Sequence, residues 1–102
     1  MSVLVVTKEN FNKTLETDKK ILLDFYADWC APCKMMAPVI ESIAEENGEY
    51  IVGKVNVDNE GEIAQLFGIS SIPYLVVIQD KKLVDSTVGV TSKEEVLQML
   101  KK

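Results

Sequence analysis

The chain has 102 residues, of which 47% are hydrophobic and 26% are charged. This length allows one domain, so we expect a single domain over residues 1–102. The formal net charge is -5 and every basic residue is a lysine. A nucleic-acid-binding protein needs a clustered basic face, so the composition argues against nucleic acid as a partner.

No targeting or membrane segment is recognisable in the sequence. Residues 1–6 carry no positive charge, no long apolar stretch and no signal-peptide cleavage site. No segment approaches the roughly 18 consecutive apolar residues of a membrane-spanning helix. We therefore expect a cytoplasmic protein without a membrane partner.

The first half of the chain predicts strands that alternate with helices. An apolar run over residues 3–6 ends at Thr7. Thr7 is a good N-cap and predicts a helix over residues 8–17. Residues 21–27 are almost continuously apolar, which is typical of a strand buried on both faces. A long helix is expected from the cysteine motif to about residue 47, stopped by Gly48 and kinked at Pro38.

The second half predicts two strands of a hairpin after a further strand and helix. Residues 51–57 are predicted to form a strand, and residues 60–67 a helix. Two apolar runs, residues 74–78 and 83–88, are expected to pair as a hairpin. A capping box at residues 92–95 (Ser-Lys-Glu-Glu) then predicts a last helix over residues 96–100. Strands alternating with helices, followed by a hairpin, indicate an α/β sandwich with a mixed sheet.

Both cysteines belong to one motif, Cys30-Ala31-Pro32-Cys33. The pair can be a redox dithiol, half of a zinc site, or two inert buried residues. Structural zinc usually takes four sulfur or imidazole ligands. Because the chain has no histidine and no third cysteine, a zinc site would need a second chain. The inert alternative fits poorly with a position where a strand meets a helix, which is not expected to lie deep in a core.

The position of the motif favours redox chemistry. The predicted helix begins at or just after Cys30, so unpaired N–H groups and the positive end of the helix dipole face its sulfur. These groups stabilise a thiolate, which is the nucleophilic form. Pro32 fits the first helical turn, where its missing N–H costs nothing. Cys33 lies one turn further and is expected to be less exposed, so we assign attack to Cys30 and resolution to Cys33.

Asp24 is the second unusual residue, because it lies within the predicted buried strand. Desolvating a carboxylate is costly, and carboxyl groups with raised pKa values cluster at active sites. The alternative is an aspartate on a solvent-facing edge of the strand. Our hypothesis is that Asp24 acts as a general acid/base that takes the proton from Cys33.

Five segments together resemble the thioredoxin family. The sequence of residues 24–34, Asp-Phe-Tyr-Ala-Asp-Trp-Cys-Ala-Pro-Cys-Lys, is similar to the active-site segment of that family. Residues 36–38, 54–58, 68–73 and 88–89 match further landmarks of the family in order and spacing. The resemblance extends over essentially the whole chain.

The resemblance implies the thioredoxin fold, a three-layer α/β/α sandwich with a central five-stranded mixed sheet and four helices. It implies a cis bond between Ile72 and Pro73, next to the dithiol, and an Ile72 backbone that pairs with an extended substrate segment. It also implies that Lys54 tunes Asp24 by its charge, although a solvated strand lysine is the alternative. The implied contact surface for substrates consists of Trp29, Ala31, Pro32, Val57, Ile72, Pro73, Gly89 and Val90. For the apolar members of this surface the alternative is core packing, which fits Trp29 least well.

The implied function is reduction of disulfides in target proteins, with recycling by a thioredoxin reductase. No glycine-rich nucleotide-binding loop is present, so we expect no cofactor beyond the Cys30–Cys33 disulfide. An acidic domain with transient partners is expected to be a monomer. Two alternatives remain open: an oxidase or isomerase of a secretory compartment, and a binding module that does not use its thiols.

Three residues depart from the usual family pattern. Ala31 stands where most members have glycine, and we expect it to tune the redox potential. The absence of a histidine between the cysteines argues for a reductant over an oxidase. Tyr74 follows the proline and is expected to affect substrate preference, while Lys81 replaces a frequent hairpin glycine and leaves the turn type open.

Overall fold

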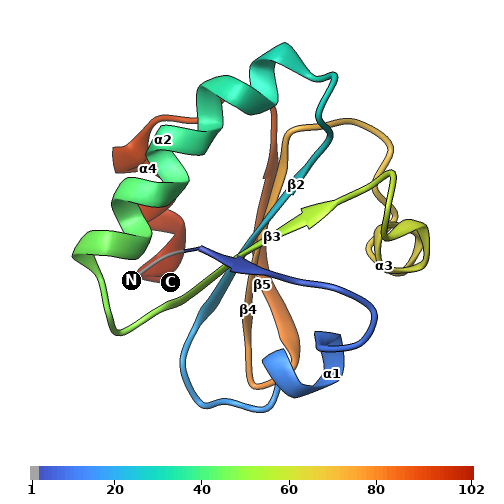
Figure 1. The fold of residues 1–102 in the computed structure, drawn as a ribbon. Coiled ribbons are helices and arrows are strands. Elements are labelled where there is room, and N and C mark those ends of the chain that lie inside the picture. The colour runs from blue at the N-terminus through green and yellow to red at the C-terminus, as the bar shows by residue number, and fades with distance from the viewer. Residues whose placement is uncertain (1–2) are drawn as a thin grey trace.

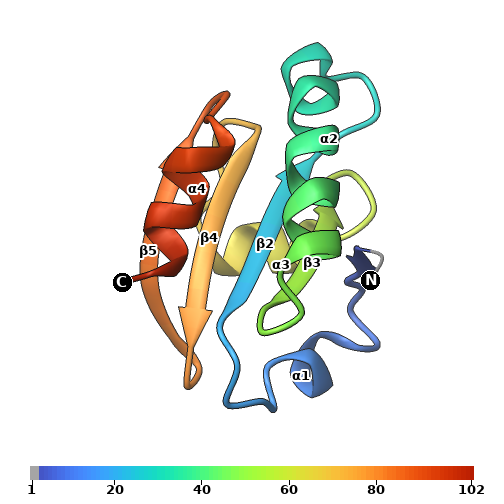
Figure 2. The same cartoon turned by 90° about the vertical axis from the view of Figure 1, so that its left-hand side faces the viewer.

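Five strands form one mixed sheet between two layers of helices (Figures 1 and 2). The computed structural model describes residues 3–102; Met1 and Ser2, part of the segment inspected above for a leader, lie outside the described residues. The elements in chain order are β1 (Leu4–Val5), α1 (Phe11–Thr14), β2 (Ile21–Tyr26), α2 (Ala31–Glu46), β3 (Ile51–Asn56), α3 (Gly61–Leu66), β4 (Tyr74–Gln79), β5 (Lys82–Val88) and α4 (Lys93–Leu100). This order confirms the predicted α/β class, with a five-stranded sheet and four helices.

Strand β2 lies at the centre of the sheet, whose order is β1-β3-β2-β4-β5. It runs parallel to β3 and antiparallel to β4, while β5 pairs antiparallel with β4 at the edge. Residues 21–25 are all buried, as the continuous apolar run predicts. The register places Asp24 between Lys54 of β3 and Leu75 of β4.

The two faces of the sheet carry separate hydrophobic cores, because successive residues of a strand point to opposite faces. On one face Leu22 packs with residues of α2 and α4, which Figure 1 shows on the left of the sheet. On the other face Leu23 and Phe25 pack with residues of α1 and α3. By this alternation Asp24, an even-numbered residue like Leu22, points to the α2 side.

The first helix is shorter than predicted, and Thr7 is not its N-cap. Helix α1 begins at Phe11 with Asn10 as the N-cap residue. The Asn10 side chain instead closes the preceding turn: its Oδ1 accepts from the Thr7 N–H at 2.8 Å, and its Nδ2 donates to the Val5 carbonyl at 2.9 Å. Because residues 7–10 form this turn, α1 begins three residues later than predicted.

The ends of the two longer helices also differ from prediction. Helix α2 ends at Glu46, and the Asn47 side chain donates to the Ile43 carbonyl at 3.1 Å. Gly48 does not adopt a left-handed φ, so the asparagine ends this helix and the glycine does not. Helix α4 begins at Lys93, three residues earlier than expected, because Ser92 of the confirmed capping box is the N-cap itself. Pro38 lies inside α2; the kink stays a prediction.

Gly53 allows β1 to approach β3 closely, and its replacement tests this packing. A Cβ atom on Gly53 would lie 2.7 Å from Cγ2 of the buried Val6 and 3.1 Å from Cδ2 of Leu23. We expect Gly53→Ala to lower the free energy of unfolding by about 1–3 kcal/mol, since overpacking forces buried side chains to shift. The control Gly48→Ala meets nothing within 4 Å and should stay within about 0.5 kcal/mol in urea unfolding. Equal midpoints for both variants would contradict the close approach.

The hairpin between β4 and β5 turns at Asp80 and Lys81, which have φ values of 54° and 65°. Positive φ at both central residues indicates a type I′ turn, which favours Asp-Gly. We therefore expect Lys81→Gly to raise the melting temperature, with a gain of about 0.5–1 kcal/mol, because glycine adopts this φ without steric cost. Lys82→Gly, placed in the strand, should lower it by a similar amount. A destabilised Lys81→Gly protein would rule out this turn.

Candidate active site

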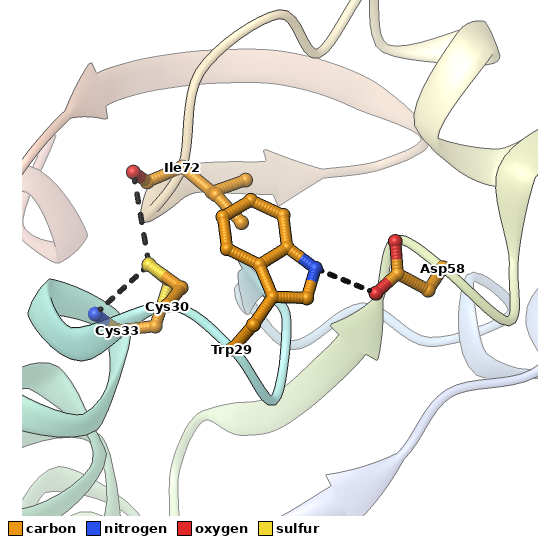
Figure 3. Close-up of a disulfide and its surroundings, with 5 residues drawn as sticks. All are labelled: Trp29, Cys30, Cys33, Asp58 and Ile72. Atoms are coloured by element: carbon orange, nitrogen blue, oxygen red, sulfur yellow. Dashed lines mark hydrogen bonds between the residues drawn. A yellow bond between two sulfur atoms is a disulfide. The ribbon is translucent and has the colours of Figure 1, made fainter.

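The two cysteines form a disulfide at the N-terminus of α2 (Figure 3). Cys30 is the N-cap residue, and its sulfur accepts a hydrogen bond from the Cys33 N–H at 3.2 Å. The sulfur thus occupies the place of the oxygen of a common N-cap. Pro32 stands in the first turn, as predicted, and Ala31 and Pro32 are both exposed. A thiolate on Cys30 would be stabilised here by the Cys33 N–H and the dipole of a 16-residue helix.

The expectation that Cys33 is less exposed than Cys30 is wrong. Each cysteine is 4% exposed, and both pack against Ala27, with Tyr26, Val57 and Ile72 around them. The reason is that the loop carrying Ile72 covers Cys30. The two cysteines differ instead in their neighbours: the Cys30 sulfur lies 4.0 Å from the Ile72 carbonyl oxygen, whereas Cys33 lines the pocket that also contains Asp24.

The loop beside Cys30 contains a cis peptide bond between Ile72 and Pro73. Pro73 is buried and Ile72 half-buried. The Pro73 carbonyl accepts from the Gly89 N–H at 2.7 Å, so the segment after β5 lies against this loop. Gly89 has a φ of 92° and is followed by Val90, which is 56% exposed. The structure therefore brings Cys30, Ile72, Gly89 and Val90 to one end of the sheet.

Trp29 lies on the opposite side of Cys30 from the α2 helix, with 71% of its surface exposed. Its indole N–H donates to Oδ2 of Asp58 at 2.8 Å (Figure 3). Asp58 did not emerge from the sequence as a site residue. The signal for it was indirect: an exposed tryptophan beside a reactive cysteine needs an acceptor that fixes its ring.

Asp24 lies in a cavity of about 330 Å³ behind the disulfide. It is 5% exposed, and its Oδ1 atom has no hydrogen-bond partner among residues 3–102. Burial raises the pKa of its carboxyl group from 3.8 to about 7, against the opposing effect of the Lys54 charge. The cavity is lined by Asp24, Tyr26, Ala27, Asp28, Cys33, Lys34, Ala37 and Lys54. The carboxyl group and the Cys33 residue thus line the same pocket, which the exposed residues Asp28 and Lys34 border.

Lys54 is half-buried and lies opposite Asp24 on the neighbouring strand β3. Its Nζ atom lies 5.8 Å from the centre of the Tyr26 ring, at cation–π distance. The side chain lines the same cavity as Asp24, so the alternative of a fully solvated lysine does not describe it. Its positive charge favours the ionised form of Asp24.

Two structural findings bear on cofactors and membranes. Within residues 3–102, no group of three or more His, Cys, Asp or Glu side chains is placed to hold a metal ion. Across the same residues, no helix combines the length and apolarity needed to span a bilayer.

Comparisons with known proteins agree with the fold and the dithiol. The family model described as Thioredoxin matches residues 2–102. A thioredoxin from Chlamydia caviae is 43% identical over 98 residues, which cover 96% of this chain and 95% of that protein. A thioredoxin from Mycoplasmoides gallisepticum is 37% identical over 97 residues, covering 95% of this chain and 97% of that protein.

Solved structures show the same architecture. A mutant thioredoxin from Halobacterium salinarum has a TM-score of 0.89 and 32% identity, covering 98% of this chain and 88% of that chain. A thioredoxin from Malassezia sympodialis has a TM-score of 0.88, also at 32% identity, covering 98% and 90%. The chain therefore belongs to the thioredoxin family and, with its Cys30–Cys33 pair at the helix N-terminus, is a thiol–disulfide oxidoreductase.

Proposed function

We propose that this chain is a protein disulfide reductase formed by one domain over residues 1–102. The observation that carries the proposal is the Cys30 sulfur, which caps α2 and faces the Ile72 carbonyl beside the exposed Trp29. In the reduced protein the Cys30 thiolate attacks a target disulfide, forming a mixed disulfide and releasing one target thiolate. The Cys33 thiolate then attacks the Cys30 sulfur and releases the second. The target gains two electrons, and the Cys30–Cys33 disulfide forms.

The residues around Cys30 are proposed to bind an extended segment of the target protein. The Ile72 carbonyl lies beside the Cys30 sulfur, two residues before β4 begins, and a substrate backbone would add to the sheet there by β-augmentation. Apolar side chains around Cys30 would contact the substrate, and two of them, Trp29 and Val90, are more than half exposed. The proposed binding residues are Trp29, Ala31, Pro32, Val57, Ile72, Pro73, Gly89 and Val90.

Asp24 is proposed to accept the proton of Cys33 while the mixed disulfide resolves. Its carboxyl group has a pKa of about 7, so it can gain or lose a proton near neutral pH. The shared cavity gives Asp24 and Cys33 a route for this proton, directly or through water. Lys54 acts on Asp24 through its charge and is a positioning residue in this scheme.

The remaining partners follow from the family. We propose that a thioredoxin reductase returns electrons to the Cys30–Cys33 disulfide, because the sequence has no glycine-rich loop that could bind a nucleotide cofactor as the electron source. The chain would work without a cofactor or metal, as a cytoplasmic monomer, and without nucleic acid or membrane partners. Its net charge of -5 suits a protein that diffuses between targets.

Insulin reduction with dithiothreitol tests the proposed activity. We expect the unmodified protein to accelerate insulin precipitation, and Cys30→Ser to abolish the acceleration because the attacking sulfur is gone. Cys33→Ser should also stop turnover; when it is reduced beforehand and freed of dithiothreitol, it should accumulate a mixed disulfide with insulin that is visible by mass spectrometry. Mixed disulfides that form with Cys30→Ser and not with Cys33→Ser would reverse the assigned roles. Full activity of a double serine variant would show that the thiols are not used.

The buried carboxyl group of Asp24 predicts a pH-dependent stability. Its pKa is about 7 in the folded protein and close to 3.8 when unfolded, so the unfolded chain ionises first as pH rises. The folded state therefore loses stability between about pH 4 and pH 7, and the loss is constant above pH 7. The free energy of unfolding of Asp24→Asn, minus that of the oxidised parent protein, should therefore be about 4 kcal/mol larger at pH 8 than at pH 4.

Denaturant unfolding of both proteins from pH 4 to pH 8 measures this difference. Asp85→Asn is a matched control, because the hydrogen bond from Lys102 lowers the pKa of Asp85 below its ordinary value of 3.8. Asp85 is then ionised in both the folded and the unfolded state across this pH range, so the stability difference between Asp85→Asn and the parent should stay nearly constant. Parallel stability curves for Asp24→Asn and the parent would show that Asp24 is solvated in solution.

A further inference from the structure

A chain of hydrogen bonds links helix α2 to the loop beside Cys30. The Pro73 carbonyl accepts from the Gly89 N–H at 2.7 Å, and the Gly89 carbonyl accepts from the Thr91 hydroxyl at 3.1 Å. The Thr91 N–H in turn donates to the sulfur of Met36 at 3.3 Å. Met36 lies on α2 three residues after Cys33, so the segment 89–91 is attached both to the cis-proline loop and to the cysteine helix.

The contact between Thr91 and Met36 is fully enclosed. Met36 is 0% exposed and Thr91 is 7% exposed. A buried backbone N–H almost always has a partner, and leaving it unpaired is unfavourable. Here the partner is a thioether sulfur, which is a weak acceptor and one that few side chains can provide. The sulfur therefore meets a specific requirement of this segment, in addition to filling the core.

The segment 89–91 depends on such contacts because it lies outside the regular structure. Strand β5 ends at Val88 and α4 begins at Lys93, so neither a ladder nor a helix holds the residues between them. Val88 and Val90 are each 56% exposed. The position of Gly89 and Val90 relative to Cys30 is therefore set by the hydrogen bonds from Gly89 and Thr91.

We propose that Met36 is a positioning residue for protein substrates, whose sulfur holds segment 89–91 where Gly89 and Val90 contact the target chain. This inference rests on the proposed reduction of protein disulfides. Met36 does not touch the reacting sulfur atoms in this scheme. Its effect should appear in the binding of an extended protein substrate, and a small disulfide that does not reach segment 89–91 should be insensitive to it.

The alternative is that Met36 only fills the core. Met36→Leu distinguishes the two, because leucine has a similar volume and no acceptor. Met99→Leu is the matched control: Met99 is a buried methionine of the same core cluster, on α4. Thr91→Val is a second variant, which keeps the backbone N–H but removes the hydroxyl that donates to the Gly89 carbonyl.

The experiment compares the parent and these three variants with insulin and with oxidised glutathione as substrates. For Met36→Leu we expect the KM for insulin to rise by about three- to tenfold, the range expected for one lost hydrogen bond. Its kcat and its rate with glutathione disulfide should stay within about twofold of the parent. The Thr91 amide should exchange its hydrogen about tenfold faster in Met36→Leu. Thr91→Val should also raise the KM, and Met99→Leu should change neither quantity.

Equal KM values for Met36→Leu and Met99→Leu, or an unchanged Thr91 amide, would overturn the proposal. If Met36→Leu does not fold, Thr91→Val decides: a parental KM for insulin would overturn the role of the segment. The parent protein separates the two levels of inference. A parent that reduces glutathione disulfide but not insulin would refute the proposed function itself, whereas an active parent with insensitive variants would refute only the role of Met36.

Discussion

The burial of β2 on both faces is the constraint on which the site depends. Neighbouring strands and a helical layer on each side remove its residues from water, which places Asp24 in a space where a free carboxylate is costly. The same strand ends immediately before the loop that delivers Cys30 to the start of α2. One central strand thus supplies the buried carboxyl group and, through the short loop at its end, positions the dithiol relative to the sheet. The chemistry of the site follows from this geometry more than from the two cysteines alone.

Local sequence patterns predict the element order and the place of the cysteine pair at the start of α2. The apolar run of β2, the capping box at Ser92 and the hairpin after Pro73 each have a signal within a few residues, and each was found. The start of α1 was missed because Asn10 can either cap a helix or close a turn, and its contacts with Val5 and Thr7 decide between them. The stop of α2 was misassigned for a similar reason, since Asn47 provides a side-chain bond where glycine was expected.

Contacts between residues that are far apart in the chain could not be predicted from local sequence patterns. The bond from Trp29 to Asp58 joins residues 29 positions apart, and the bond from Thr91 to Met36 joins residues 55 apart. A methionine at a helical core position gives no indication that its sulfur accepts a hydrogen bond. The equal burial of the two cysteines likewise depends on the loop of Ile72, which is far away in the chain. These contacts arise only when the layers of the sandwich come together.

The direction of each cysteine, and not its exposure, explains how two similar thiols can take different roles. Cys30 precedes α2 and its sulfur faces the Ile72 carbonyl, at the end of the sheet where a substrate backbone can approach. Cys33 is one helical turn further and lines the cavity that holds Asp24. In the proposed mechanism an incoming disulfide therefore meets Cys30 first, and Asp24 accepts the proton of Cys33 on the inner side. Since Met36 follows on the same helix, a shift of α2 would move the nucleophile, the resolving thiol and the 89–91 segment together.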